Sequence, residues 1–467
     1  MRLRPGLLTA IAVLCIAAAA GQAQYVEDSV DVGGAWVGSL AYNPEQDEIW
    51  GASWSGNRVF AISCSRNTVV ASIPMSSPGD LVWNSTFGKL YCAYYGPGQE
   101  SLAVISVASR QVIKRLEMPG STTPVWDAVS DRVYVSCQTT GRVAVVDCAT
   151  DSLLKCIPVG ACPMKMYINT LRRKLYVLNY DDGTVSIVDM ATNQVTKTVD
   201  VGGTPNAGYY CRSADKFYCS SPSGIGRVTV IDGRGDTVLA RIPLPAHGEA
   251  LSMAGDERTA TVVLGVHSSV GNHGYFVHAP NDSVTSVLPV GREPWGMLFN
   301  SNSGLFYSAN AISDNVSVMT GDGSRVTGTL PVGDAPFVLV AVPRHQRIYV
   351  GHNNCSKVFV IRDTFERSPE GQPSKPDSAA GFALGPNPFR DRLSMVCGMT
   401  VIAKEVMVFG EDGRLVRVLN VTKSASGVLR MSWDGKDSRG RSVRAGVYFC
   451  TLDNGAKRIS RKIVLTE

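Results

Sequence analysis

The sequence predicts an all-β protein, and three features of its 467 residues carry this prediction. Short runs rich in Val, Ile, Thr and Tyr alternate with turn residues, which is typical of consecutive antiparallel hairpins. The same phrase returns about every 40 to 45 residues over most of the chain, as in repeat proteins. Charged residues make up 18% of the chain and glycine is plentiful at 46, a composition typical of exported β-rich proteins.

Residues 175–203 are the clearest copy of this phrase, LYVLNYDDGTVSIVDMATNQVTKTVDVGG. It contains three apolar or β-branched runs separated by the turns DDG and ATNQ, and it closes on Gly202 and Gly203. No run of helical length fits between these turns. The stretch therefore predicts three successive antiparallel strands.

Regular spacing relates the other copies to this one. A proline precedes a tyrosine by thirteen residues in five places: Pro78/Tyr91, Pro163/Tyr176, Pro205/Tyr218, Pro294/Tyr307 and Pro336/Tyr349. A strand of the form V-x-V-I-D follows in many copies, and a phrase such as IPVG closes them. The resulting units are 34–75, 76–120, 121–160, 161–203, 204–246, 247–291 and 292–333.

Residues 334–363 begin an eighth unit but lack its last strand. The missing strand stands at the other end of the chain, because SVDVG at 29–33 matches TVDVG at 198–202. We therefore expect the N-terminal strand to complete the last sheet and to close the array on itself.

Four-stranded units of this length indicate an eight-bladed β-propeller over residues 25–363, closed by the N-terminal strand. Radial stacking buries both faces of each sheet, which explains why runs such as VSIVD and VAVVD are apolar at nearly every position. A seven-bladed propeller remains an alternative if 247–291 is an insertion, and an open β-solenoid is a second alternative.

The repeat style resembles the YVTN family of β-propeller repeats. Lys89-Leu-Tyr91, Lys174-Leu-Tyr-Val177 and Arg347-Ile-Tyr-Val350 carry the resemblance, followed by V-x-V-I-D and PVG phrases. It covers about residues 26–363 and implies architecture rather than a particular activity. No Gly-His…Trp-Asp signature of WD40 propellers occurs.

Residues 1–23 are expected to be a signal peptide, with a basic start, an apolar run and a small-residue cleavage site ending at Ala23. This predicts a secreted bacterial protein, extracellular or on the outer cell surface. No segment of the mature chain reaches transmembrane length. Residues 364–383 are rich in Pro, Ser and Gly and are expected to be a linker.

A second domain is predicted at 384–467. Its strands are expected at 393–397, 406–409, 415–419, 428–433, 446–452 and 459–465, with turns at Glu411-Asp-Gly413 and Asp453-Asn-Gly455. Six or seven short strands in about 80 residues are typical of an Ig-like β-sandwich.

This domain resembles the Ig-like domain of the flagellar hook-capping family and the related sorting domain of type IX secretion. The matching residues are Pro386-Asn-Pro-Phe389, the hairpin Val406–Arg414, Trp433-Asp-Gly435, Gly440, Gly446-Val-Tyr448 and the Lys462-Ile-Val-Leu465 ending. The resemblance implies sorting or anchoring through the secretion machinery, with the domain cleaved or kept at the surface.

The cysteines do not form the pattern of a stapled scaffold. Cys92, Cys137 and Cys219 fall within predicted strands, where free cysteine packs as a small apolar residue. Cys148, Cys156 and Cys162 could contain one bridge. Cys397 and Cys450 are the best candidate disulfide, since both alternate with apolar residues of the second domain.

Most constellations that could carry chemistry have a structural explanation. His267, His273 and His278 share one unit but flank a Gly-rich loop, so a polar loop is favoured over a metal site. Residues 434–440 resemble a calcium loop, yet Lys436 replaces an oxygen ligand. The recurring Asp147, Asp189 and Asp232 are expected to cap turns. No cofactor and no bound metal are predicted, and no basic stripe suggests nucleic acid.

The positions where each unit opens vary more than the rest of the repeat. Aromatic and polar residues there fit a binding funnel around one mouth of the ring. The candidate ligand-binding residues are Trp36, Asp80, Trp126, Met164, Lys165, Asn206, Glu249, Trp295 and Phe337.

These features favour a non-catalytic binding or scaffold protein that recognises an extracellular protein, glycan or small molecule. The alternative is an enzyme, lactonase-like or quinoprotein-like, acting at the axial funnel. That alternative predicts that Asp80, Asn206 and Glu249 meet at a common point. A surface-layer module without a ligand is a third possibility.

Overall fold

The computed structural model describes residues 24–96, 99–221, 226–245, 248–364, 382–384, 389–390, 393–397, 405–410, 415–419, 422–423, 429–453 and 458–466. The expected signal peptide and most of the expected linker lie outside these residues. The chain divides into two compact units, residues 1–365 and 366–467.

The described residues of the first unit form eight antiparallel sheets of four strands each. Seven of them are built from four consecutive strands. The first four of these are β2 (Val37–Asn43) to β5 (Thr68–Pro74) with β3 (Glu48–Ser53) and β4 (Arg58–Ser63); β6 (Pro78–Asn84), β7 (Lys89–Gly96), β8 (Gln99–Ser106) and β9 (Gln111–Glu117); β10 (Ser121–Asp127), β11 (Arg132–Cys137), β12 (Arg142–Asp147) and β13 (Ser152–Pro158); and β14 (Pro163–Asn169), β15 (Lys174–Asn179), β16 (Thr184–Asp189) and β17 (Gln194–Asp200).

The next three sheets follow the same order along the chain. They are β18 (Ala207–Cys211), β19 (Lys216–Ser221), β20 (Arg227–Asp232) and β21 (Val238–Pro243); β22 (Glu249–Asp256), β23 (Thr261–Ser268), β24 (Gly271–His278) and β25 (Ser283–Pro289); and β26 (Pro294–Asn300), β27 (Leu305–Asn310), β28 (Asn315–Thr320) and β29 (Val326–Pro331). Residues 247–291 therefore contribute a regular sheet of their own. Two short 3₁₀ turns, Gln138–Thr140 and Pro343–His345, complete the described elements of this unit.

The eighth sheet joins the two ends of the unit. Strands β30 (Pro336–Val342), β31 (Arg347–His352) and β32 (Lys357–Asp363) are completed by β1 (Gln24–Asp31), which pairs with β32. In the register Val30 faces Val358 and Ser29 faces Phe359. The expected pairing of the N-terminal strand with the last three strands is confirmed.

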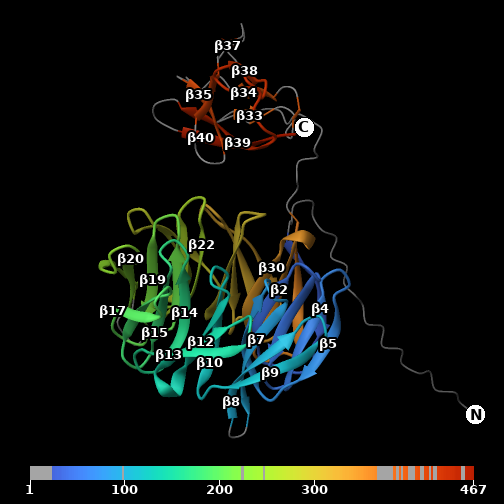
Figure 1. Cartoon of the computed structure of the whole chain (residues 1–467), viewed down its shortest axis with the longest axis vertical. Coiled ribbons are helices and arrows are strands. Elements are labelled where there is room, and N and C mark those ends of the chain that lie inside the picture. The colour runs from blue at the N-terminus through green and yellow to red at the C-terminus, as the bar shows by residue number, and fades with distance from the viewer. Residues whose placement is uncertain are drawn as a thin grey trace, which may run out of the picture. The chain divides into compact units, whose positions relative to one another are not determined.

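Neighbouring sheets pack through their first strands. Each of β2, β6, β10, β14, β18, β22, β26 and β30 contacts the next in this order, and β30 contacts β2. In Figure 1 the orange β30 lies beside the blue β2. Apolar clusters fill each interface: Trp50 and Val59 pack with Leu90 and Ile105, and Val358 packs with Phe60. Because both faces of the central strands are buried, these strands are largely apolar, with a few buried polar residues such as Ser186 and Thr229.

The recurring aspartates at the ends of third strands cap turns as expected. Asp147 accepts hydrogen bonds from the backbone N–H groups of Ala149 and Thr150 at 3.0 and 2.9 Å. Asp189 accepts from the equivalent groups of Ala191 and Thr192 at 2.9 and 2.8 Å. The hydrogen bonds from Thr150 and Thr192 are the main reason why the pKa of each carboxyl lies below its usual value.

The described residues of the second unit form two four-stranded antiparallel sheets with a shared core. One sheet has the order β33 (Phe382–Leu384), β34 (Leu393–Cys397), β38 (Leu429–Trp433) and β37 (Thr422–Lys423); the other has β36 (Leu415–Leu419), β35 (Glu405–Gly410), β39 (Gly446–Asp453) and β40 (Arg458–Leu465). Trp433 is fully buried in this core between the rings of Phe389 and Tyr448. The expected strands of an Ig-like sandwich are present in the described residues.

The cysteine predictions have different outcomes. Cys92, Cys137 and Cys219 are buried within strands, as expected. Cys148, Cys156 and Cys162 form no disulfide, so the possible bridge among them is not made. The proposed Cys397–Cys450 pair cannot be placed because the Cys397 side chain lies outside the described residues; Cys450 is buried.

Candidate functional site

The sheets of the first unit open on a repeated backbone feature. The residue just before several first strands has a left-handed backbone, with φ of 58° at Trp36, 52° at Cys162, 55° at Glu293 and 53° at Ala335. A hydrogen bond then ties the residue after the second strand to this turn. The backbone N–H of Trp54, for example, donates to the carbonyl of Trp36 at 3.1 Å.

This hairpin geometry places the start of each first strand and the end of each second strand at the same edge. Tyr95, which lies near the end of the second strand β7, makes the equivalent bond, since its N–H donates to the carbonyl of Ser77 at 3.1 Å. Side chains of Trp54 and Tyr95 therefore join those of the opening residues. The sequence analysis did not include these two aromatics, although the antiparallel pairing of the first two strands was a usable signal.

Four aromatic residues line a hollow of about 220 Å³ at this edge, which we call the aromatic hollow. The ring centroids of Trp36 and Trp54 lie 5.8 Å apart, and those of Trp54 and Tyr95 lie 4.8 Å apart. Phe337 completes the apolar lining. Trp36 is 54% exposed, so a large part of its ring remains available to a ligand.

An ion pair forms the polar part of the aromatic hollow. Lys165 Nζ lies 2.9 Å from Asp80 Oδ2, and the hydroxyl of Thr123 donates to the same oxygen at 2.8 Å. The negative charge of Asp80 raises the pKa of Lys165, although burial opposes this shift. The two charges cancel, so the hollow presents donors and acceptors without a net charge.

The three residues of this polar group occupy equivalent places on consecutive sheets. Asp80, Thr123 and Lys165 each stand where the first strand bulges away from the second, between Pro78 and Leu81 or the corresponding residues. A bulge re-aims side chains that would otherwise follow the pleat. The local irregularity of three sheets thus brings their side chains together.

A second hollow of about 500 Å³ shares Phe337 with the first, and we call it the acidic hollow. Its lining includes Glu293, Asp314 and Asp334 and the ring of Trp295. The Trp295 and Phe337 centroids lie 5.7 Å apart. The indole N–H of Trp295 donates to Glu293 Oε2 at 3.1 Å.

The structure brings together only part of the predicted funnel. Trp36, Asp80, Met164, Lys165 and Phe337 line the aromatic hollow, and Trp295 lines the acidic hollow with Phe337.

The remaining predicted residues lie elsewhere. Trp126 stands near the far end of β10 and packs against the buried cluster that contains Tyr91 and Val133, so it is an inter-sheet core residue. Asn206 precedes β18, and its Oδ1 is buried without a hydrogen-bond partner. Glu249 begins β22, opposite His267. Neither Asn206 nor Glu249 lines the hollow that contains Asp80.

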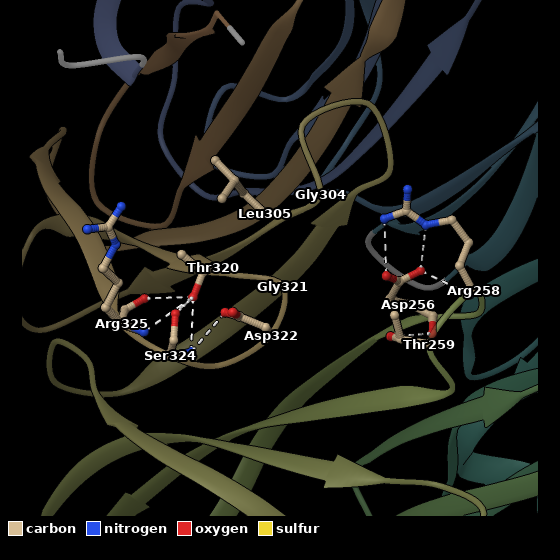
Figure 2. A pocket seen from close by; sticks show the side chains of 10 residues that line it. All are labelled: Asp256, Arg258, Thr259, Gly304, Leu305, Thr320, Gly321, Asp322, Ser324 and Arg325. Carbon is tan, nitrogen blue, oxygen red and sulfur yellow. Dashed lines mark hydrogen bonds and ion pairs between the residues drawn. The ribbon is translucent and has the colours of Figure 1, made fainter. Parts of the chain in front are cut away.

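A third hollow, of about 620 Å³, lies between turns of the sheets β22–β25 and β26–β29 (Figure 2). Its polar groups are largely engaged with one another. Arg258 Nε donates to Asp256 at 2.9 Å, and the backbone of Ser324 donates to Asp322 at 3.0 Å. As Figure 2 shows, these contacts remain within two separate turns, so the hollow lacks convergent groups.

The candidate metal sites have local partners. His267 Nδ1 lies 2.8 Å from Asn272 Oδ1, and His278 Nδ1 lies 3.1 Å from Asn281 Oδ1. Asp437 accepts hydrogen bonds from the backbone of Arg439 and Arg441, as in a turn. Among the described residues no group of three or more His, Cys, Asp or Glu side chains is arranged to hold a metal ion.

Comparisons with known proteins bear on the second unit. Residues 400–455 match the family model of the FlgD Ig-like domain. No curated protein matches the chain. Within the described residues, no helix has the length and apolar character needed to cross a membrane. The C-terminal unit is therefore an Ig-like domain, in agreement with its two-sheet architecture.

Proposed function

We propose that the first unit is an eight-bladed β-propeller of YVTN-like repeats, and that it binds an extracellular ligand without catalysis. The circular order of contacts among the first strands supports this arrangement, as does the pairing of β1 with β32. In a closed ring every sheet packs against two neighbours, which removes the exposed ends that an open stack would leave.

The aromatic hollow is the proposed binding site, and a neutral polyhydroxylated ring, such as a terminal sugar, is the proposed ligand. The observation that carries this proposal is the aromatic wall of Trp36, Trp54 and Tyr95 beside the Asp80–Lys165 pair. Aromatic faces favour the apolar C–H faces of a sugar, and the neutralised ion pair offers donors and acceptors to its hydroxyl groups.

Export through a Sec signal and a type IX-like C-terminal domain is part of the same proposal. Strand β1 begins at Gln24, directly after the expected cleavage site, so cleavage would leave the sheet-completing strand intact. The Ig-like match over 400–455 fits a sorting or anchoring role at the cell surface. In this role the second unit binds the secretion machinery, and the first unit binds the ligand.

A glycan array followed by calorimetry tests the proposed ligand. The protein spanning residues 24–467 is expected to bind a sugar, and Trp36→Gly is expected to weaken binding at least about tenfold, which corresponds to 1.4 kcal/mol. Glycine fits the left-handed backbone of this position, where an L side chain costs roughly 1–2 kcal/mol. The variant should therefore keep the unfolding midpoint of the unmodified protein.

Phe87→Ala supplies the matched control, because Phe87 is another exposed aromatic, 40% accessible, on the turn after β6. It should bind sugar like the unmodified protein. An array without bound glycans, or binding that Trp36→Gly leaves unchanged, would overturn the proposed site.

A further inference from the structure

We propose that the acidic hollow binds an alkylammonium group, such as the side chain of lysine on a peptide. This inference concerns a second site, beyond the sugar site proposed above, and a ligand of opposite electrostatic character. It depends on four observations about the residues that line the hollow.

The first observation is the sign of the charges. Glu293, Asp314 and Asp334 line the hollow, and none of the described residues that line it is a lysine or arginine. Asp314 Oδ1 accepts the backbone N–H of Ala335 at 3.0 Å, and Glu293 accepts the Trp295 indole, so two of the carboxylates are held in place. The potential in the hollow is therefore negative and favours a cation.

The second observation is the aromatic pair. Trp295 and Phe337 both line the hollow, with ring centroids 5.7 Å apart and planes tilted by 31°. A ring face attracts a cation through its quadrupole, and indole does so most strongly. The indole N–H donates to Glu293 Oε2, and such a bond makes the ring more electron-rich and strengthens this effect.

The third observation is an unsatisfied acceptor. Asn353 lines the hollow, and its Oδ1 is buried without a hydrogen-bond partner. A buried carbonyl oxygen without a partner costs free energy. Because this oxygen is buried, the amide group has to rotate towards the hollow before a ligand N–H can donate to it. Its backbone is fixed, because Asn353 N donates to Ala335 O and the carbonyl of Asn353 accepts Trp36 N, both at 2.8 Å.

The fourth observation is the size and spacing of the hollow, which favour an organic cation over a metal ion as the ligand. The three carboxylates are not grouped closely enough to hold a metal. A volume of about 500 Å³ instead accommodates an ammonium head with its aliphatic stem. Ile312, which is 47% exposed, and Ala311 offer apolar surface for such a stem.

The test is an NMR titration with Nα-acetyl-lysine methylamide, using the tryptophan indole N–H signals as reporters. Trp295→Leu identifies the Trp295 signal by its loss. That signal should shift with the lysine probe, while the same probe acetylated on Nε, which has no charge, should bind at least about fivefold more weakly, the value for roughly 1 kcal/mol of cation–π attraction.

Two variants test the lining. Trp295→Leu should weaken binding about fivefold, measured by calorimetry, and Asp334→Asn should weaken it about threefold at low salt. Asp181→Asn changes the net charge equally on an exposed turn and should have no effect. Because Asp334 lies on an exposed turn, its variant remains informative even if Trp295→Leu fails to fold.

Equal affinity for the charged and acetylated probes, or unchanged binding by Asp334→Asn together with Trp295→Leu, would overturn the inference. Trp36→Gly should leave lysine binding intact while it weakens sugar binding. Failure of one proposal can thus be told apart from failure of the other. A free amine such as methylammonium, tested beside a lysine peptide, distinguishes a small-molecule source from a peptide source.

Discussion

His352 occupies a position where other units have asparagine, and one of its ring nitrogens is buried without a hydrogen-bond partner. It ends β31 at the place where Asn179 ends β15 and Asn310 ends β27. Asn310 Nδ2 donates to Asn315 Oδ1 and to Ser317 Oγ at 2.8 and 2.9 Å. His352 is fully buried; its Nδ1 lies 3.1 Å from the carbonyl of Lys357, but its Nε2 is buried without a partner.

His352→Asn is expected to make the protein less sensitive to mild acid. Burial lowers the pKa of His352 from 6.5 to about 4, so the imidazole is neutral in the folded state. Between these values the unfolded state binds more protons, and stability falls as the pH decreases from 6.5 towards 4, by roughly 1 kcal/mol per pH unit. Urea unfolding at pH 7, 6 and 5 should show that the free energy of unfolding decreases less for the variant than for the unmodified protein. An identical pH dependence would contradict this explanation.

Single residues also mark the limit of what the sequence could predict. The turn aspartates were predictable because a capping side chain bonds its own neighbours within three residues. The Asp80–Lys165 pair was not, because the two residues are 85 positions apart and meet only through bulges on separate sheets. Trp126 looked like a funnel residue by composition, yet its place on the strand directs it into an inter-sheet core.

Neighbouring sheets are joined by a side-chain contact that recurs along the chain. A basic residue and a tyrosine two positions later, near the start of a second strand, hold the turn between the third and fourth strands of the next sheet. Lys216 Nζ lies 2.8 Å from Asp282 Oδ2, and the Tyr218 hydroxyl donates to Asp282 Oδ1 at 2.7 Å. Lys89 and Tyr91 make the same two contacts with Asp151.

The held residue has a left-handed backbone, with φ of 56° at Asp282 and 51° at Asp151. Asn is also used in this role, since the Tyr134 hydroxyl donates to Asn193 Oδ1 at 2.8 Å. Asp and Asn tolerate this conformation better than other residues with a side chain. Turn preference and inter-sheet bonding thus select the same residue types.

Asp282→Ala is expected to destabilise the first unit by roughly 2–3 kcal/mol, because it leaves the buried Tyr218 hydroxyl without its acceptor. Lys216 loses its ion-pair partner but still donates to the carbonyl of Ala279. Asp282→Asn should lower the free energy of unfolding by less, since asparagine retains an acceptor for Tyr218 and is suited to the left-handed turn. Chemical denaturation of both variants measures the difference. Equal losses would contradict a role for the tyrosine hydrogen bond and the turn.

The spacing of proline and tyrosine predicted the strands but not this contact. The thirteen-residue interval is a property of one hairpin, and periodicity within a sheet reports it directly. The partner of each tyrosine stands in the next sheet, and only packing reveals it. Between the sheets β2–β5 and β6–β9 the same contact has the opposite charges. The acidic residue Glu48 begins the second strand, and its Oε1 accepts from Arg110 of the next sheet's turn at 2.7 Å.

At the scale of the molecule, the first unit depends on a strand supplied by its own N-terminus. Glu27 on β1 accepts Arg347 Nε at 2.6 Å and Arg362 Nη2 at 2.7 Å. The hydrogen bond from Arg347 lowers the pKa of Glu27, although burial opposes this. Val30 and Val32 are buried with Phe60 and Tyr349, residues of two different sheets. The sequence predicted this pairing because SVDVG repeats the phrase that ends the other units.

Removal of β1 is expected to open the proposed ring, and a peptide is expected to restore it. A chain that begins at Gly33 leaves one edge of β32 (Lys357–Asp363) unpaired and loses the burial of two valines, worth roughly 3–6 kcal/mol. Its unfolding midpoint should fall and its exposed edge should promote association. A peptide of residues 24–32 should restore the midpoint at one equivalent by adding the missing strand. The same peptide with Val30→Asp should not, because a carboxylate would enter the apolar interface. If the shortened chain is as stable as the complete one, β1 does not close the unit, and the circular arrangement fails with it.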